Sequence, residues 1–209
     1  MEMSYEDWGR LDMPAALDAL IEACPGLPVS HVGHSVGGHF AGFMPNHDRI
    51  TKHAFVSVGS GYWGHHFRSY NPAELFFWWI YGPWSLLRHG YIKSGKLWRG
   101  ADLPRGVFIP WRRWCQDPLY FTRRLETELQ PNHFTEVTAP IRSWIFSDDP
   151  IANLRTAPRM LALYSRAPSD LILHAPSDYG VPRIGHEGAF RRGMERFWDD
   201  ILTWIKTPA

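Results

Sequence analysis

The chain has 209 residues, of which 44% are hydrophobic, which is enough for one globular domain with a sizeable buried core. Its 22 basic and 21 acidic side chains give a formal charge of +1, so it lacks the basic field that phosphate binding needs, and we expect no nucleic-acid partner. Cys24 and Cys115 are too few for a disulfide framework. The first ten residues, MEMSYEDWGR, lack the charged-then-apolar layout of a signal peptide, which favours a cytoplasmic location.

The first elements expected along the chain are a helix, a buried strand and a second helix. Residues 12–23, DMPAALDALIEA, place Pro14 in a first helical turn and apolar residues at helical spacing, and the sequence CPG then ends the helix. Residues 27–35, LPVSHVGHS, are typical of a short buried strand that runs into a tight turn. The small residues of VGGHFAGFM, at 36–44, suit a helix packed closely against a sheet.

Three further strands are expected at 53–60, 141–149 and 170–178, and each ends in a polar or glycine-rich loop. Helical patterns follow the last two, at 153–167 and from about residue 190 to 205. This alternation is what parallel βαβ units require. The predicted fold class is therefore α/β, with a parallel sheet of about four strands.

Residues 62–132 interrupt this alternation, because they carry no clean strand signal between the second and third strands. We interpret them as a mainly helical, tryptophan-rich cap. The predicted division is thus a core segment at 1–61, the cap insertion at 62–132, and a second core segment at 133–209.

The cap contains the aromatic run LFFWWIYGPWSLL at residues 75–87. It is shorter than the roughly 18 apolar residues of a spanning helix, and Gly82 and Pro83 interrupt it, so we expect no transmembrane segment. Weak contact with a membrane surface stays open, since Trp and Tyr favour lipid interfaces. Its aromatic side chains are expected to form the core of the cap. A more specific hypothesis is that four of them also wall an apolar acyl pocket: Phe76, Trp78, Trp79 and Trp84.

Ser35 lies between the first predicted strand and the following helix, in the frame Gly33-x-Ser35-x-Gly37. This is the layout of a nucleophile elbow, where a sharp strand-to-helix turn exposes the hydroxyl and the flanking glycines allow close backbone approach. The motif alone is modest evidence, and a structural turn serine is the alternative. The predicted strand and helix on either side favour the elbow.

A serine hydroxyl is a weak nucleophile at neutral pH and needs an imidazole base, whose tautomer a carboxylate fixes. Asp148 and Asp149 directly follow the third predicted strand, and His186 lies in a glycine-flanked loop after the fourth. In doubly wound sheets such groups meet at the carboxyl ends of the strands. Each of these residues alone has an ordinary structural interpretation. Together they are stronger evidence for a catalytic site than any one of them.

Four motifs, VGHSVGG, SGYWG, SDDP and IGHEGAF, together resemble the α/β-hydrolase superfamily, and within it the predicted cytoplasmic hydrolases related to serine aminopeptidases. The resemblance implies that Ser35 is the nucleophile, Asp149 the acid and His186 the base. Asp148 is the alternative acid. The backbone N–H of Val36 would then be one donor of the oxyanion hole.

Relative to that superfamily, we expect the chain to lack a front section of about four strands and the loop that supplies the second oxyanion donor. The strand before Ser35 would then lie at the edge of the sheet. Loss of an oxyanion donor costs on the order of a hundred- to a thousand-fold in rate. The sequence thus predicts a truncated hydrolase whose residues alone do not form a competent enzyme.

The resulting hypothesis is a serine hydrolase that takes a small-molecule acyl substrate, an ester, thioester or small amide, and needs no cofactor. Ser35 argues against related dehalogenases and epoxide hydrolases, which place an aspartate at the elbow. The alternative is a non-catalytic binding module that uses the tryptophan-rich cap, and acyl transfer to another acceptor also stays open. We expect no zinc site at His31, His34 and His39, because their spacing crosses a strand, a turn and a helix. The oligomeric state is not predicted.

Overall fold

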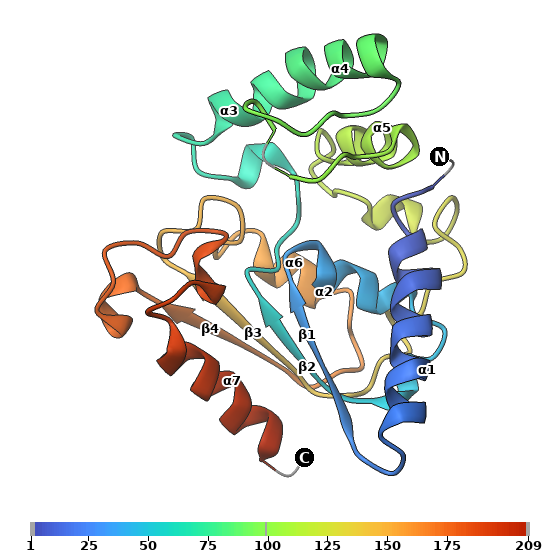
Figure 1. Cartoon of the computed structure of the whole chain (residues 1–209), viewed down its shortest axis with the longest axis vertical. Helices are drawn as coiled ribbons and strands as arrows, with labels where there is room; N and C mark the ends of the chain where they lie inside the picture. Colours follow the sequence, from blue (N-terminus) through green and yellow to red (C-terminus); the bar gives the residue numbers. More distant parts are fainter. Residues whose placement is uncertain (1–2, 99, 208–209) are drawn as a thin grey trace.

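The computed structural model describes residues 3–98 and 100–207 and contains one sheet of four parallel strands, drawn as arrows in Figure 1. These are β1 (Val29–His34), β2 (Ile50–Val56), β3 (Ile141–Phe146) and β4 (Ser169–His174). Their order in the sheet is β1-β2-β3-β4, and all three pairings are parallel. The predicted α/β class with a parallel sheet is confirmed, and β1 lies at one edge, with the Val32 side chain 44% exposed.

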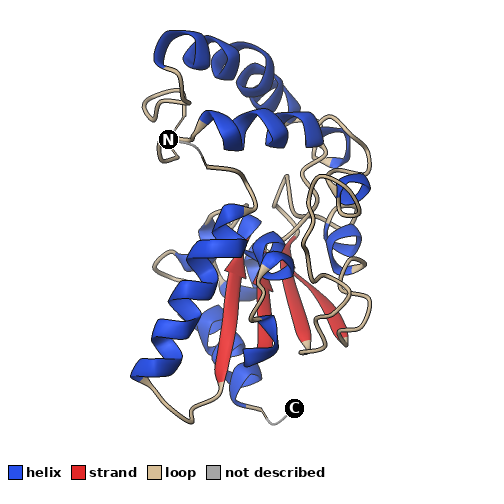
Figure 2. Cartoon of the chain, turned by 90° about the vertical axis from the view of Figure 1, so that its right-hand side faces the viewer, coloured by secondary structure: helices blue, strands red, loops and turns tan. Residues whose placement is uncertain are grey.

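Helices lie on both sides of this sheet (Figures 1 and 2). They are α1 (Met13–Ala23), α2 (Val36–Phe40), α6 (Ala157–Leu161) and α7 (Glu195–Lys206). Side chains alternate along a strand, so Ala54 and Val56 of β2 pack in one cluster with Phe197 of α7. Phe55, between them, packs in the opposite cluster with Phe40 of α2. The central strands β2 and β3 are therefore buried on both faces, as is typical of parallel sheets, whereas the edge strands β1 and β4 are partly exposed.

Two helices are shorter than the sequence pattern indicates. The helix expected at 153–167 is reduced to α6, because Asn153 and Thr156 hold the preceding residues in side-chain-bonded turns: the Asn153 N–H donates to the Thr156 hydroxyl over 2.9 Å. The closing helix, expected from about 190, begins only at Glu195, because Gly193 has a φ of +94° and cannot continue a right-handed helix.

The described residues of the insertion at 62–132 contain three α-helices, α3 (Asn71–Phe76), α4 (Gly82–His89) and α5 (Arg105–Trp114), and a π-helical turn at Phe77–Tyr81 joins the first two. In both views they lie beyond the ends to which the strand arrows point (Figures 1 and 2). Shorter helical turns of the chain are Trp8–Asp12, Ala41–Phe43, His47–Arg49, Trp63–His65, Thr122–Arg124, Pro176–Tyr179 and Gly188–Phe190. Within residues 3–98 and 100–207, no helix has the length and apolar character needed to cross a membrane.

One apolar cluster joins the insertion to the sheet. It contains Trp78 and Phe108 from the insertion together with Phe40 and Phe55 from the core. The division into a core segment at 1–61, a cap insertion at 62–132 and a second core segment at 133–209 remains a prediction. Residues 1–2, 99 and 208–209 of those segments lie outside the described residues.

Two histidines are buried in this core in their neutral form. Burial lowers the pKa of His39 to about 4, and burial together with the neighbouring His31 lowers the pKa of His53 to about 3. The His39 ring is paired on both sides: Nε2–H donates to the Gly59 carbonyl over 2.9 Å, and Nδ1 accepts from the Tyr5 hydroxyl over 2.8 Å. A proton added to either ring would place a charge in an apolar interior.

These histidines should make the protein less stable as the pH falls. Their folded pKa values lie below the ordinary 6.5, so the unfolded chain binds the proton first, and the free energy of unfolding declines as the pH drops from about 6.5 toward 4. For His53 alone we expect a loss of about 2 kcal/mol between pH 7 and pH 5. Urea unfolding of wild type and His53→Leu at both pH values measures this contribution. If the free energy of unfolding of His53→Leu depended on pH as strongly as that of the wild type, this expectation would be contradicted.

Candidate active site

The turn between β1 and α2 holds Ser35 in an unusual backbone conformation. Ser35 has φ 50° and ψ −118°, a combination that residues with a side chain adopt only under strain. At Gly33, a Cβ atom would lie 2.9 Å from the backbone of both Gly37 and Gly38, so strand and helix approach too closely there for any side chain. The chain therefore turns sharply at Ser35, between the end of β1 and the start of α2.

The second glycine of the frame has a different role from the expected one. A Cβ atom at Gly37 would meet nothing within 4 Å, whereas one at Gly38 would lie 2.5 Å from the Val58 side chain. The close packing of α2 against the segment that follows β2 therefore depends on Gly38 and not on Gly37.

A chain of hydrogen bonds runs from Ser35 to His186 and on to Asp149. The Ser35 Oγ lies 2.9 Å from Nε2 of His186, and Nδ1 of His186 lies 3.0 and 3.1 Å from the two carboxylate oxygens of Asp149. Asp149 is fully buried, and one of its oxygens also accepts the N–H groups of Ile151 and Ala152. These bonds hold the carboxylate as an acceptor, so Nδ1 of His186 carries the proton and Nε2 is free to accept one from Ser35.

Among the described residues Asp148 makes no hydrogen bond to the imidazole of His186, which argues against the alternative prediction that Asp148 is the acid. Its two oxygens accept the N–H groups of Ile184 and Gly185, over 2.9 and 3.0 Å. Because consecutive residues after a strand point in different directions, Asp149 turns inward while Asp148 anchors the loop that carries His186.

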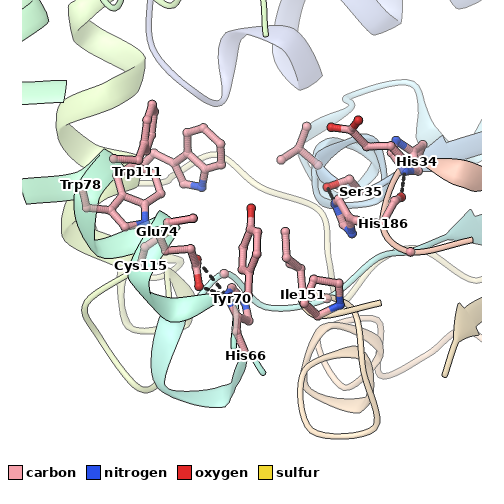
Figure 3. A pocket seen from close by; sticks show the side chains of 18 of the residues that line it. His34, Ser35, His66, Tyr70, Glu74, Trp78, Trp111, Cys115, Ile151 and His186 are labelled. Atoms are coloured by element: carbon pink, nitrogen blue, oxygen red, sulfur yellow. Dashed lines mark hydrogen bonds and ion pairs between the residues drawn. The ribbon is translucent and has the colours of Figure 1, made fainter. Parts of the chain in front are cut away.

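His34 supports the same loop and was not recognised from the sequence as part of the site. Its Nε2–H donates to the backbone carbonyl of His186 over 2.8 Å, and burial lowers its pKa, which keeps the ring neutral. Figure 3 shows His34 beside Ser35 and His186. The position of His34 next to Ser35 in the sequence could have indicated a role in the site. Its hydrogen-bond partner could not be predicted, because that partner lies in a distant loop.

Val36 is the first residue of α2, and the first N–H groups of a helix have no intrahelical acceptor. Its N–H is therefore available beside the Ser35 hydroxyl. A free N–H group at this place is what a developing negative charge on a substrate oxygen would need.

A cavity of about 590 Å³ opens beside Ser35 and His186 and extends under the insertion (Figure 3). Its far wall is aromatic: Phe77, Trp78, Trp98 and Trp111. Of the four aromatic residues expected to line a pocket, only Trp78 does so. The prediction for Phe76, Trp79 and Trp84 was wrong, since these side chains are exposed on the other side of the helical segment.

The same cavity has a buried polar wall that the sequence did not reveal. Nδ1 of His66 lies 2.8 and 2.9 Å from the carboxylate oxygens of Glu74, and Nε2 of His66 lies 3.2 Å from the Ser60 carbonyl. Tyr70 projects into the cavity near them (Figure 3), and burial with the nearby Glu74 raises its pKa to about 12. Its hydroxyl is therefore protonated at neutral pH and can donate a hydrogen bond.

The three histidines considered for a zinc site point to separate partners. His31 lies 3.1 Å from His53, Nδ1 to Nδ1, while His34 bonds to the His186 carbonyl and His39 to the Gly59 carbonyl. They do not converge on one point.

Several solved structures similar to this one are hydrolases. The chain is similar to a monoacylglycerol lipase of Paleococcus ferrophilus, with 16% identity over 97% of this chain and 75% of that one and a TM-score of 0.52. A soluble variant of Saccharomyces cerevisiae monoglyceride lipase, in complex with a substrate analogue, gives 14% identity, 93% and 67% coverage and a TM-score of 0.61. A puromycin-hydrolysing peptidase of Mycobacterium tuberculosis gives 15% identity and a TM-score of 0.51, over 95% of this chain and 26% of that one.

These similarities establish the α/β-hydrolase fold, which confirms the resemblance at the level of architecture. No family model matches the sequence, and no curated protein matches it significantly. The narrower relationship to hydrolases akin to serine aminopeptidases remains a prediction.

Proposed function

We propose that this protein is a serine hydrolase that cleaves an ester, thioester or small amide, with Ser35 as nucleophile, His186 as base and Asp149 as acid. The observation that carries the proposal is the continuous hydrogen-bond chain from the strained Ser35 to the buried Asp149. The α/β-hydrolase fold supports it, because in that fold a serine at this turn is the usual nucleophile.

In the proposed first step, the Ser35 oxygen attacks the acyl carbon as Nε2 of His186 accepts the hydroxyl proton. The carboxylate of Asp149 stabilises the resulting imidazolium, and the Val36 N–H donates to the oxyanion. His186 then gives the proton to the leaving alcohol, thiol or amine, which leaves the acyl group on Ser35. Water attacks the acyl carbon as His186 accepts its proton. The bond between that carbon and the Ser35 oxygen then breaks, His186 returns the proton to the Ser35 oxygen, and the acid is released.

The cavity supports an acyl group with an apolar end. The aromatic wall formed by Phe77, Trp78 and Trp111 would bind hydrocarbon, while His66, Glu74 and Tyr70 offer hydrogen bonds to a polar part of the substrate. Two of the similar structures are a monoacylglycerol lipase and a monoglyceride lipase, which supports a substrate with an apolar acyl group and a polar part.

A fluorophosphonate probe tests the proposal, because it phosphonylates activated serines. The sequence predicts that these residues alone do not form a competent enzyme, but Ser35, His186 and Asp149 are hydrogen-bonded to one another in this chain. We therefore expect mass spectrometry to find the label on Ser35 of the wild type and none on Ser35→Ala, and this result would overturn the prediction of an incompetent enzyme. Ser57→Ala is a matched control, because Ser57 also follows a strand with a positive φ of 53°, yet its hydroxyl has no hydrogen-bond partner among the described residues. This control should label like the wild type. Label on any other serine, or none at all, would overturn the assignment.

A second candidate function is that of a binding module, and an exposed apolar stripe on the insertion favours it. Phe76, Trp79, Ile80, Trp84 and Leu87 recur at helical spacing and are 39% to 90% exposed. Such a stripe would suit a lipid surface or a partner protein. A wild-type chain whose Ser35 stays unlabelled would favour this function over the hydrolase.

A further inference from the structure

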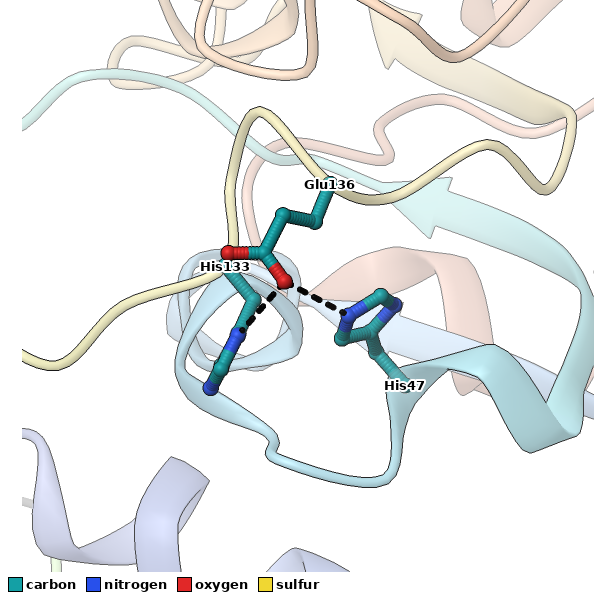
Figure 4. Close-up of side chains that lie close together, drawn as sticks. All are labelled: His47, His133 and Glu136. Carbon is teal, nitrogen blue, oxygen red and sulfur yellow. Dashed lines mark hydrogen bonds and ion pairs between the residues drawn. The ribbon is translucent and has the colours of Figure 1, made fainter.

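A cluster of two histidines and one glutamate lies away from the cavity described above. His47, His133 and Glu136 each offer one ligand atom, and these atoms all lie within 4.8 Å of one another. Figure 4 shows the three side chains converging from two separate segments of the chain. None of them lines the cavity beside Ser35.

The distances within the cluster are close to those of a metal centre. Nδ1 of His133 lies 3.1 Å from an oxygen of Glu136, and Nε2 of His47 lies 3.8 Å from the same oxygen. In a tetrahedral zinc site with bonds of about 2.0–2.1 Å, neighbouring ligand atoms are roughly 3.3 Å apart. Small side-chain rotations would therefore bring all three atoms onto one ion.

The backbone around the cluster is held in place without any ion. The His133 N–H donates to the Gly42 carbonyl over 2.7 Å, and the Glu136 N–H donates to the His133 carbonyl over 2.9 Å, which places both side chains on one side of a turn. Phe134, between them, is buried against Phe43, with ring centroids 5.1 Å apart. These contacts fix the segment with His133 and Glu136 against Gly42 and Phe43, close in the chain to His47.

The segment with His47 is anchored independently. His47 begins a 3₁₀ turn, His47–Arg49, and the preceding Asn46 donates through its side-chain amide to the Pro14 carbonyl and to Asp18 of α1, over 3.2 and 2.8 Å. A metal ion would find its ligands already near their bound positions, and less ordering entropy would oppose binding.

The ligand types indicate which ion would bind. Two neutral imidazoles and one carboxylate suit zinc and similar transition ions, whereas calcium and magnesium prefer oxygen ligands alone. The carboxylate gives the site a formal charge of −1, which complements a divalent cation. The side chains are 12%, 21% and 57% exposed for His47, His133 and Glu136, so an ion and its water ligand can enter from solvent.

We propose that His47, His133 and Glu136 form a zinc-binding site, with water as the fourth ligand. The site would fix residues 133–136, where the chain returns from the insertion, to the turn after α2. Zinc would therefore stabilise the folded chain without taking part in chemistry at Ser35. This inference is independent of the proposed hydrolase activity.

Isothermal titration of the chelator-treated full chain with zinc chloride tests the site. We expect one zinc ion per chain, and binding at least about tenfold weaker in His47→Ala, His133→Ala and Glu136→Gln. His174→Ala is the matched control, because His174 is also partly exposed beside a single carboxylate, Asp178, at 3.6 Å. This variant should bind zinc like the wild type, and magnesium should not bind detectably.

Two further readouts separate a built site from loose surface binding. Cobalt(II) in place of zinc should give the intense visible absorption of a tetrahedral centre in the wild type and lose it in Glu136→Gln, which keeps the size of the side chain. Zinc should also raise the midpoint of thermal unfolding of the wild type but not of His133→Ala. Absence of zinc binding, or equal binding by wild type and all three ligand variants, would overturn the proposal.

Discussion

Asp149→Asn should lower the rate of ester hydrolysis by about 10⁴-fold, whereas Asp148→Asn should lower it only about tenfold. The amide of an asparagine at 149 would donate to Nδ1 of His186 and so place the ring proton on Nε2. In that tautomer His186 cannot accept the Ser35 proton, and loss of the correct tautomer in a serine triad costs about this much. The side chain at 148 only holds the loop backbone at Ile184 and Gly185.

The expected loss for Asp148→Asn is that of about one hydrogen bond, because asparagine keeps one acceptor oxygen for the two N–H groups. The measurement is kcat/KM for a p-nitrophenyl ester, together with the rate of fluorophosphonate labelling of Ser35. Ser35→Ala gives the background. Equal losses in the two variants, or a larger loss in Asp148→Asn, would contradict the assignment of Asp149 as the acid.

Trp114→Ala should destabilise the protein by about 3–5 kcal/mol. Trp114, at the end of α5, is only 2% exposed, and its ring centroid lies 5.2 Å from that of Tyr5 and 5.8 Å from that of Phe121. Its removal would leave a cavity where the insertion meets the rest of the chain, and large-to-small changes of buried tryptophan cost this amount. The indole N–H has no hydrogen-bond partner among the described residues, so the loss would come from packing.

Urea unfolding followed by far-ultraviolet circular dichroism measures this effect, with Trp84→Ala as the matched control. Trp84 is 53% exposed, and its truncation should cost less than about 1 kcal/mol. Because one apolar cluster joins the insertion to the sheet, we expect a single unfolding transition in each variant. Equal destabilisation by the two changes, or a separate early transition, would show that the insertion does not share its core with the sheet.

Local sequence patterns were sufficient for the strands and for the turn at Ser35. The short apolar segments at 27–35 and 141–149 each contain a strand, because a parallel sheet buried on both faces requires near-continuous apolar residues. Helix limits were less predictable. Gly193 delays the start of α7, and this depends on a backbone φ that the apolar periodicity does not encode.

The direction of each side chain was harder to predict than the element that carries it. The run Phe76 to Trp79 was correctly expected to be helical. Neighbouring residues of a helix point in different directions, so Trp78 lines the cavity while Trp79 is 53% exposed and packs against Arg112. The same holds for Asp148 and Asp149, since adjacent carboxylates after one strand take different partners.

By itself, the sequence determined the α/β class, the parallel sheet and the placement of a serine, an aspartate and a histidine after the first, third and fourth strands, because these features depend on periodicity and on residues close together in the chain. Only the tertiary structure decided which aspartate meets His186, which aromatic residues form the cavity wall, and that His66 pairs with Glu74 there. It also brought His47 to His133 and Glu136. The physical reason is that such contacts join segments that are distant in the chain. The local sequence does not fix the direction of a side chain, and the packing of whole helices and strands then selects one direction.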